Sequence, residues 1–84
     1  PTTPGNLTAS NTTQTSTDVS WTASTDNVGV SFYSVYVGGT LQGTTTNTSY
    51  AISGLTANTT YTITVEAEDA AGNVSSAASV NVTT

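Results

Sequence analysis

The sequence predicts an all-β fold, a seven-stranded antiparallel sandwich, for three reasons. Short runs of apolar residues alternate with polar ones, as in strands that bury one face, and the clearest run spans Tyr61 to Glu68. Turn-forming Gly, Asn and Asp residues interrupt these runs about every ten residues, a spacing typical of sandwiches. No stretch carries an apolar repeat at helical period together with helix caps, which argues against any α/β design.

Each expected strand is marked by apolar residues two positions apart, because alternate side chains of a strand point to one face. The third strand is the longest, from Val28 to Val37. Gly38-Gly39 then forms a tight hairpin turn, since glycine accepts the positive φ that such turns need. In chain order, the apolar markers are Leu7 and Ala9; Val19 and Trp21; Val28, Val30, Phe32, Tyr33, Val35 and Val37; Leu41; Tyr50 and Ile52; Tyr61, Ile63, Val65 and Ala67; and Val74, Val80 and Val82.

The chain is long enough for one domain, which we place at residues 6–84. Residues 1–5 read as a linker-like N-terminal segment, because Pro1 and Pro4 favour an extended backbone and remove hydrogen-bond donors. The chain starts at Pro1 without Met, so we expect it to be processed or part of something longer. If copies were joined end to end, Val82-Thr83-Thr84 would run directly into this segment, as at a seam between modules.

The charge balance excludes two classes of partner. The chain has no Lys, Arg or His, and its five acidic residues give a net charge of −5. Binding to a phosphate backbone or to an anionic membrane surface requires cations, so neither nucleic acid nor membrane is an expected partner. Cysteine is absent as well, so stability must come from strand pairing and packing rather than from disulfides.

The residue types that catalysis needs are also missing. A nucleophile relay requires a base such as His, or a perturbed Lys or Cys, and the chain has none of these. Glu66 and Glu68 lie on the same outward face of one expected strand, where a carboxylate pair could act as in glycoside hydrolysis. A solvated charge pair that discourages unwanted strand pairing explains them better. We therefore predict that the chain is not an enzyme and binds no cofactor.

Several motifs in the same order and spacing resemble the fibronectin type III family over essentially the whole chain. They are Pro4-Gly5-Asn6-Leu7, Val19-Ser20-Trp21, Tyr33 to Val37, Gly54-Leu55 followed by Tyr61, and Ala67 to Ser75. The segments Ser24 to Val30 and Asp69 to Ser75 resemble the bacterial type, as found in secreted carbohydrate-active enzymes and surface proteins. The resemblance implies a seven-stranded immunoglobulin-like sandwich. The chain has no Arg, so it cannot carry an Arg-Gly-Asp adhesion motif.

The resemblance also implies structural roles for particular residues. Trp21 is expected to fill the space between the sheets. Leu55 and Tyr61 fit a tyrosine corner, in which the ring packs inward and the hydroxyl bonds backbone a few residues upstream. The predicted structural core comprises Trp21, Tyr33, Val35, Leu55, Tyr61, Ile63 and Val65.

Two parts of the expected surface are candidate binding sites, one for calcium and one for protein or sugar. In a sandwich of this family the loops that hold Asp26 and Asp69 lie at one end, so Asp26, Asp69 and Asn73 could bind calcium. Asp and Asn also stabilise turns by bonding their own backbone, and we favour that role and predict no metal site. Phe32 and Tyr36 fall on the outward face of their strand, about 13 Å apart, and mark a surface contact with protein or sugar.

The leading hypothesis is a non-catalytic spacer or accessory module of a larger secreted bacterial protein, linked to polysaccharide-active or surface-displayed domains. The Thr-, Ser- and Asn-rich composition favours a secreted, extracellular or cell-surface location. The alternative is a structural subunit or repeat of an extracellular fibre, adhesin or surface decoration, because a nearly uncharged surface associates easily. Expected partners are neighbouring domains of the same chain or identical copies, with polysaccharide as a further candidate.

Overall fold

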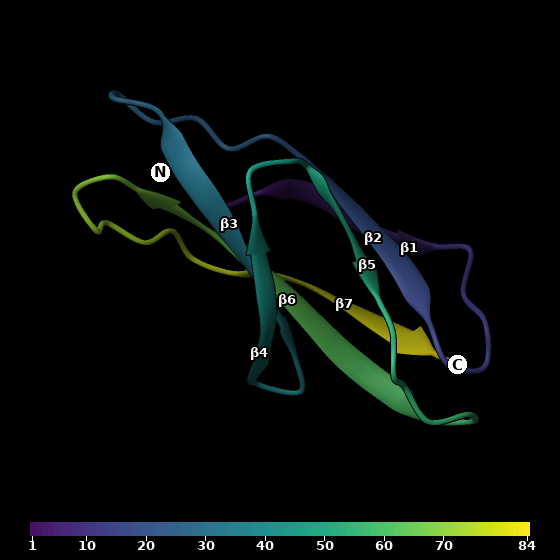
Figure 1. Cartoon of the computed structure of the whole chain (residues 1–84). Helices are drawn as coiled ribbons and strands as arrows, with labels where there is room; N and C mark the ends of the chain where they lie inside the picture. Colours follow the sequence, from purple (N-terminus) through teal and green to yellow (C-terminus); the bar gives the residue numbers. More distant parts are fainter.

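The computed structural model describes residues 1–84 as two packed antiparallel sheets with no helix (Figure 1). One sheet has the order β1-β2-β5 and the other β4-β3-β6-β7. The strands are β1 (Gly5–Ser10), β2 (Thr17–Thr22), β3 (Val30–Val37), β4 (Thr40–Thr45), β5 (Ser49–Ile52), β6 (Thr60–Asp69) and β7 (Ala78–Thr83). The predicted seven-stranded sandwich is confirmed. No helix exists that could cross a membrane.

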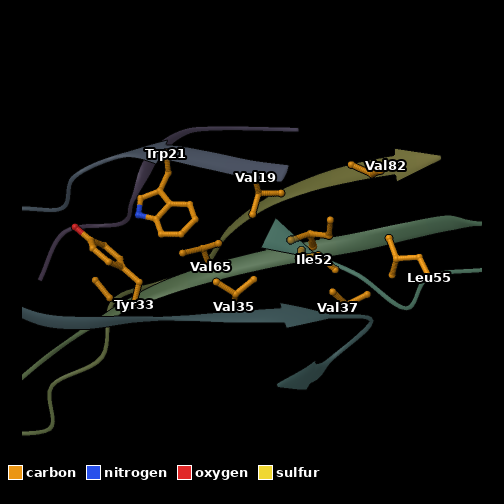
Figure 2. Close-up of a cluster of buried hydrophobic side chains, with 11 residues drawn as sticks. Val19, Trp21, Tyr33, Val35, Val37, Ile52, Leu55, Val65 and Val82 are labelled. Atoms are coloured by element: carbon orange, nitrogen blue, oxygen red, sulfur yellow. The ribbon is translucent and has the colours of Figure 1, made fainter. Parts of the chain in front are cut away.

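The core lies between the two sheets and is built by the alternation seen in the sequence. Along β2 the residues Thr17, Val19 and Trp21 are buried while the residues between them are exposed. Trp21 meets Tyr33 edge to face, with ring centroids 5.3 Å apart (Figure 2). The buried apolar cluster comprises Val19, Trp21, Tyr33, Val35, Val37, Ile52, Leu55, Ile63, Val65, Ala67 and Val82. Of the predicted core, only Tyr61 is outside this cluster, half-buried and packed against it.

Tyr61 forms the contact expected of a tyrosine corner. The backbone N–H of Thr56, five residues upstream, donates to the Tyr61 hydroxyl at 2.8 Å. The Thr56 side chain, followed by this backbone bond, lowers the pKa of the Tyr61 phenol, because hydrogen bonds donated to the oxygen favour its ionised form. The neighbouring backbone N–H of Leu55 donates to the carbonyl of Thr15 at 2.9 Å, so the β5–β6 connection is fastened to the β1–β2 loop.

Two valines expected in strands lie outside them. Val28 is 80% exposed, because Asp26 accepts the backbone N–H groups of Val28 and Gly29 and turns the chain before β3 begins. Val74 makes only an isolated bridge to Glu68 and is 49% exposed, and β7 begins four residues later. The expected third and seventh strands are therefore shorter at their N-terminal ends.

Polar side chains pair across neighbouring strands on the outer faces. Thr60 and Thr83 join hydroxyls at 2.9 Å, and Thr62 donates to the Asn81 side chain at the same distance. On the other sheet, the Thr8 and Ser20 hydroxyls lie 3.3 Å apart. These pairs explain how a chain so rich in Thr and Ser forms sheets, because β-branched and hydroxyl side chains stabilise strands through cross-strand contacts.

The two sheets also meet where the Tyr50 ring from β5 lies over Gly43 of β4. A Cβ atom at position 43 would collide with the Tyr50 hydroxyl and crowd the ring behind it. Gly43 lies opposite Val35, whose side chain is in the core, so the missing side chain would point inward. Glycine is therefore required here for space and not for its backbone freedom.

Candidate functional site

The two ends of the chain lie at opposite ends of the molecule, which measures 41 × 20 × 17 Å (Figure 1). This placement follows from the topology. β1 is antiparallel to β2, and β7 is antiparallel to β6. Because β2 and β6 run in the same direction, β1 and β7 also run in the same direction (Figure 1). A polypeptide continuing from either end would therefore leave from opposite poles of the sandwich.

The segment predicted as a linker, residues 1–5, is held against the domain. Gly5 already belongs to β1, and Pro4 is buried. Thr2 donates its backbone N–H to the carbonyl of Thr25 at 2.8 Å, and the N–H of Thr25 donates back to the Thr2 hydroxyl at 2.8 Å. We call this reciprocal pair of bonds the N-terminal clamp.

A second clamp holds the C-terminal residue. Thr84 donates its backbone N–H to the carbonyl of Thr59 at 3.1 Å, and its hydroxyl accepts the N–H of Thr59 at 3.1 Å. The same hydroxyl lies 2.6 Å from the carbonyl of Thr56, to which it donates. We call this set of bonds the C-terminal clamp. Both terminal segments are thus fixed to loops at their own end of the sandwich.

Asp26 lies beside the N-terminal clamp. Its carboxylate pairs with the Pro1 amino group at 3.0 Å. That bond, with the two amide donors from Val28 and Gly29, holds the pKa of Asp26 below its ordinary value. The depression between this loop and the N-terminal residues is lined by no hydrophobic residue, unlike the pockets that usually bind organic ligands.

Asp69 organises the turn between β6 and β7. Its side chain accepts the backbone N–H groups of Ala71 and Asn73 at 3.0 and 2.9 Å, and the Asn73 amide at 3.0 Å. The Asn73 side chain, followed by these backbone donors, lowers the pKa of Asp69. Both carboxylates proposed as calcium ligands thus bond their own loops, and no group of three or more Asp, Glu, His or Cys side chains gathers in the chain.

The Asp69 turn should make stability sensitive to acid. Because the folded-state pKa lies below the ordinary value of 3.8, the stabilisation is fully present above about pH 3.8 and is lost as pH falls through the lower folded-state value. Thermal melts between pH 7 and pH 2 should show the midpoint of Asp69→Asn falling less steeply than that of the parent below pH 4. Asp18→Asn, which removes one carboxylate from the exposed face of β2, is the matched control for the loss of one negative charge.

Phe32 and Tyr36 lie on the outer face of β3, and both are half-buried rather than fully exposed. Tyr36 donates its hydroxyl to a carboxylate oxygen of Glu66 at 2.9 Å, across the β3–β6 pairing. This bond and the negative charge of Glu66 raise the pKa of Tyr36. Ser34, between the two rings, is 8% exposed although no third layer covers this sheet. The neighbouring side chains must therefore lean over it.

Glu66 and Glu68 face outward on β6, opposite Ser34 and Phe32 of β3. They flank the aromatic rings on an open sheet face, with neither a pocket nor a second layer over them. This setting lacks the enclosure that a carboxylate pair needs to act as acid and base. The sequence predicts that all four residues face outward, but it does not predict the Tyr36–Glu66 bond. That bond depends on the register between β3 and β6, and the two residues are 30 positions apart in the chain.

Two features of the fold are expected of the family suggested by the sequence: the strand order β1-β2-β5 against β4-β3-β6-β7, and the tyrosine corner. The family described as the fibronectin type III domain matches residues 2–83. The chain is a fibronectin type III domain. It is 62% identical over 77 residues to exoglucanase A of Cellulomonas fimi and 56% identical over 77 residues to chitinase A1 of Niallia circulans. Among solved structures, chitinase ChiA74 from Bacillus thuringiensis contains a region that superposes with a TM-score of 0.91 at 40% identity.

The fibronectin type III domain accounts for only a small part of these relatives. The matched regions cover 92% of this chain but 9% and 11% of the two curated proteins, and 98% of this chain but 13% of the solved chitinase chain. The similarity therefore describes one module that is shared by several larger bacterial proteins.

Proposed function

We propose that this chain is a non-catalytic spacer module of a larger secreted bacterial protein, linked to domains that act on polysaccharide. The observation that carries the proposal is that the chain enters and leaves at opposite ends of a 41 Å sandwich, through the two clamps. Relatives named as an exoglucanase and chitinases contain this module within much longer chains, which supports a secreted location and polysaccharide-active neighbours.

The clamps give the spacer its mechanism. A flexible linker lets neighbouring domains tumble independently, whereas terminal residues bonded to the domain fix the direction in which the chain continues. Each neutral hydrogen bond contributes about 0.5–1.5 kcal/mol, so several together keep a terminal segment ordered most of the time. The result is a bead that sets both the distance and the relative angle of the domains it joins.

Two copies joined in tandem test this role. Spin labels on Val28→Cys in each copy report the distance between modules, since Val28 is 80% exposed and the chain has no other cysteine. The parent tandem should give a narrow distance distribution. Replacing Thr84 of the first copy and Thr2 of the second with Val keeps the side-chain shape but removes both clamp hydroxyls, and should broaden it.

Thr8→Val, which removes an exposed hydroxyl from the middle of β1, is the matched control and should leave the distribution narrow. A broad distribution in the parent tandem would contradict the spacer mechanism. Association of the single domain in a concentration series would instead favour the alternative, a self-assembling structural subunit. Release of soluble sugar by the purified chain from chitin or cellulose would contradict the non-catalytic assignment.

A further inference from the structure

The outer face of the β4-β3-β6-β7 sheet carries a group of apolar and charged side chains outside the core. Phe32 and Tyr36 stand on β3, and Glu66 and Glu68 on β6. Leu41 lies opposite Tyr36 and is 53% exposed, and Val74 lies opposite Glu68 and is 49% exposed. We call these residues the aromatic–acidic face: Phe32, Tyr36, Leu41, Glu66, Glu68 and Val74.

One of the two aromatic rings on this face is held in place by a hydrogen bond. The Tyr36 hydroxyl is bonded to Glu66 at 2.9 Å, which restricts the orientation of the Tyr36 ring. Phe32 and Tyr36 are both half-buried, and Ser34 between them is 8% exposed, so neighbouring side chains cover Ser34. The part of each ring that remains accessible can attract cations and apolar C–H groups through its π electrons.

The carboxylates on this face have no positive partner. The chain contains no Lys, Arg or His, and the single ion pair in the structure joins Asp26 to the Pro1 amino group. Asp69 is occupied by its own turn, whereas Glu68 has no hydrogen-bond partner and Glu66 has only the Tyr36 hydroxyl. A ligand that brings ammonium groups would therefore complement both the charge and the aromatic rings.

The position of the face favours a rigid, flat polymer over a peptide. Peptides commonly add a strand at a sheet edge, where backbone groups are free to pair. Here the rings and carboxylates stand on β3 and β6, which pair with each other in the middle of the sheet, so neither is an edge strand. Phe32 and Tyr36 are about 13 Å apart along the strand, so a ligand that touches both must be an oligomer rather than a single sugar.

From these observations we propose that the aromatic–acidic face binds a cationic amino sugar polymer, chemically a chain of glucosamine units such as partially deacetylated chitin. The sugar rings stack on Phe32 and Tyr36, and the ammonium groups pair with Glu66 and Glu68. This binding role is separate from the spacer role, since the face lies on the side of the sandwich and the clamps lie at its two ends.

Titration of the 84-residue chain with a glucosamine hexamer, followed by NMR amide shifts, tests the proposal. The titration is run at about pH 5.5, where the amines of the glucosamine hexamer are protonated. We expect shifts confined to β3, β4 and β6 around the aromatic–acidic face. N-acetylglucosamine and glucose hexamers, which lack the ammonium groups, should bind at least about tenfold more weakly, as should a lysine hexapeptide, which lacks the sugar rings.

Substitutions separate a site from general attraction to an acidic protein. Glu66→Gln combined with Glu68→Gln should weaken binding about tenfold, and Phe32→Thr about fivefold. Asp18→Asn removes a carboxylate from the opposite sheet and should leave affinity unchanged once the small change in net charge is allowed for. Tyr36→Phe keeps the ring but removes its bond to Glu66, so it should weaken binding less than Phe32→Thr. The dispersion of each variant's amide NMR spectrum without ligand shows whether that variant is folded.

Four outcomes would overturn the proposal. Shifts that map to the β1-β2-β5 sheet or to the loops would place the ligand elsewhere. Equal binding of the lysine peptide would show that net charge alone attracts the ligand, and so would an equal loss per removed carboxylate in Asp18→Asn and in the combined Glu66→Gln and Glu68→Gln variant. Equal binding of the uncharged hexamers would show that the ammonium groups are not recognised.

Discussion

Replacing Trp21 with Ala is expected to lower the free energy of unfolding by about 3–5 kcal/mol. Trp21 is 6% exposed, packs edge to face on Tyr33 and is the only tryptophan of the chain. Its removal leaves a cavity between two thin sheets that cannot collapse without separating paired strands. Small domains have a free energy of unfolding near the lower end of about 5–15 kcal/mol, so the variant should keep at most about 2 kcal/mol and unfold at a much lower urea concentration.

Urea denaturation followed by far-UV circular dichroism measures this loss, because the substitution also removes the fluorescence of Trp21. Val28→Ala is the matched control: it shortens an apolar side chain that is 80% exposed and should change stability by less than about 0.5 kcal/mol. A loss below about 1 kcal/mol in Trp21→Ala would contradict the packing described for this core.

Replacing Gly43 with Ala should cost about 1–3 kcal/mol, although Ala is normally tolerated in a strand. The new methyl group would meet the Tyr50 hydroxyl and ring, and either the ring or strand β4 must move. The φ angle of Gly43 is not in the left-handed region, so the backbone itself presents no obstacle. The whole effect should therefore depend on Tyr50.

A double-mutant cycle checks that dependence. In a Tyr50→Phe background the nearest colliding atom is absent, so Gly43→Ala should cost less there, by at least about 0.5 kcal/mol. Equal costs in both backgrounds would show that the two residues are not coupled. Gly38→Ala offers a contrast: no atom lies near its added methyl, but its φ of 57° makes any cost a backbone effect that Tyr50→Phe leaves unchanged.

The strands were predictable from the sequence because one face of each is buried. In β6 the alternation of Ile63, Val65 and Ala67 with Thr and Glu leaves only one register that buries the apolar residues. Val28 and Val74 were placed wrongly for the opposite reason. Each is an isolated valine beside a turn, where Asp26 or Asp69 and their backbone bonds decide the chain path, and apolar character carries no information about that.

The residues of the aromatic–acidic face were predictable singly but not as a group. Period-two alternation puts Phe32 and Tyr36 outward on one strand and Glu66 and Glu68 outward on another. That the two strands are neighbours, and that Glu66 reaches Tyr36, depends on sheet order and register, which arise from packing of the whole domain. The two clamps could not be predicted either, because nothing in the sequence distinguishes Thr2 and Thr84 from the many other threonines of the chain.

The parallel course of β1 and β7 determines how the module responds when its ends are pulled apart. Tension applied at residues 1 and 84 acts along these terminal strands, while their hydrogen bonds to β2 and β6 lie across the direction of pull. The six paired positions between β6 and β7 must then slide as a set instead of opening one at a time. A module with this arrangement should resist tension along its long axis better than one whose terminal strands separate one pair at a time.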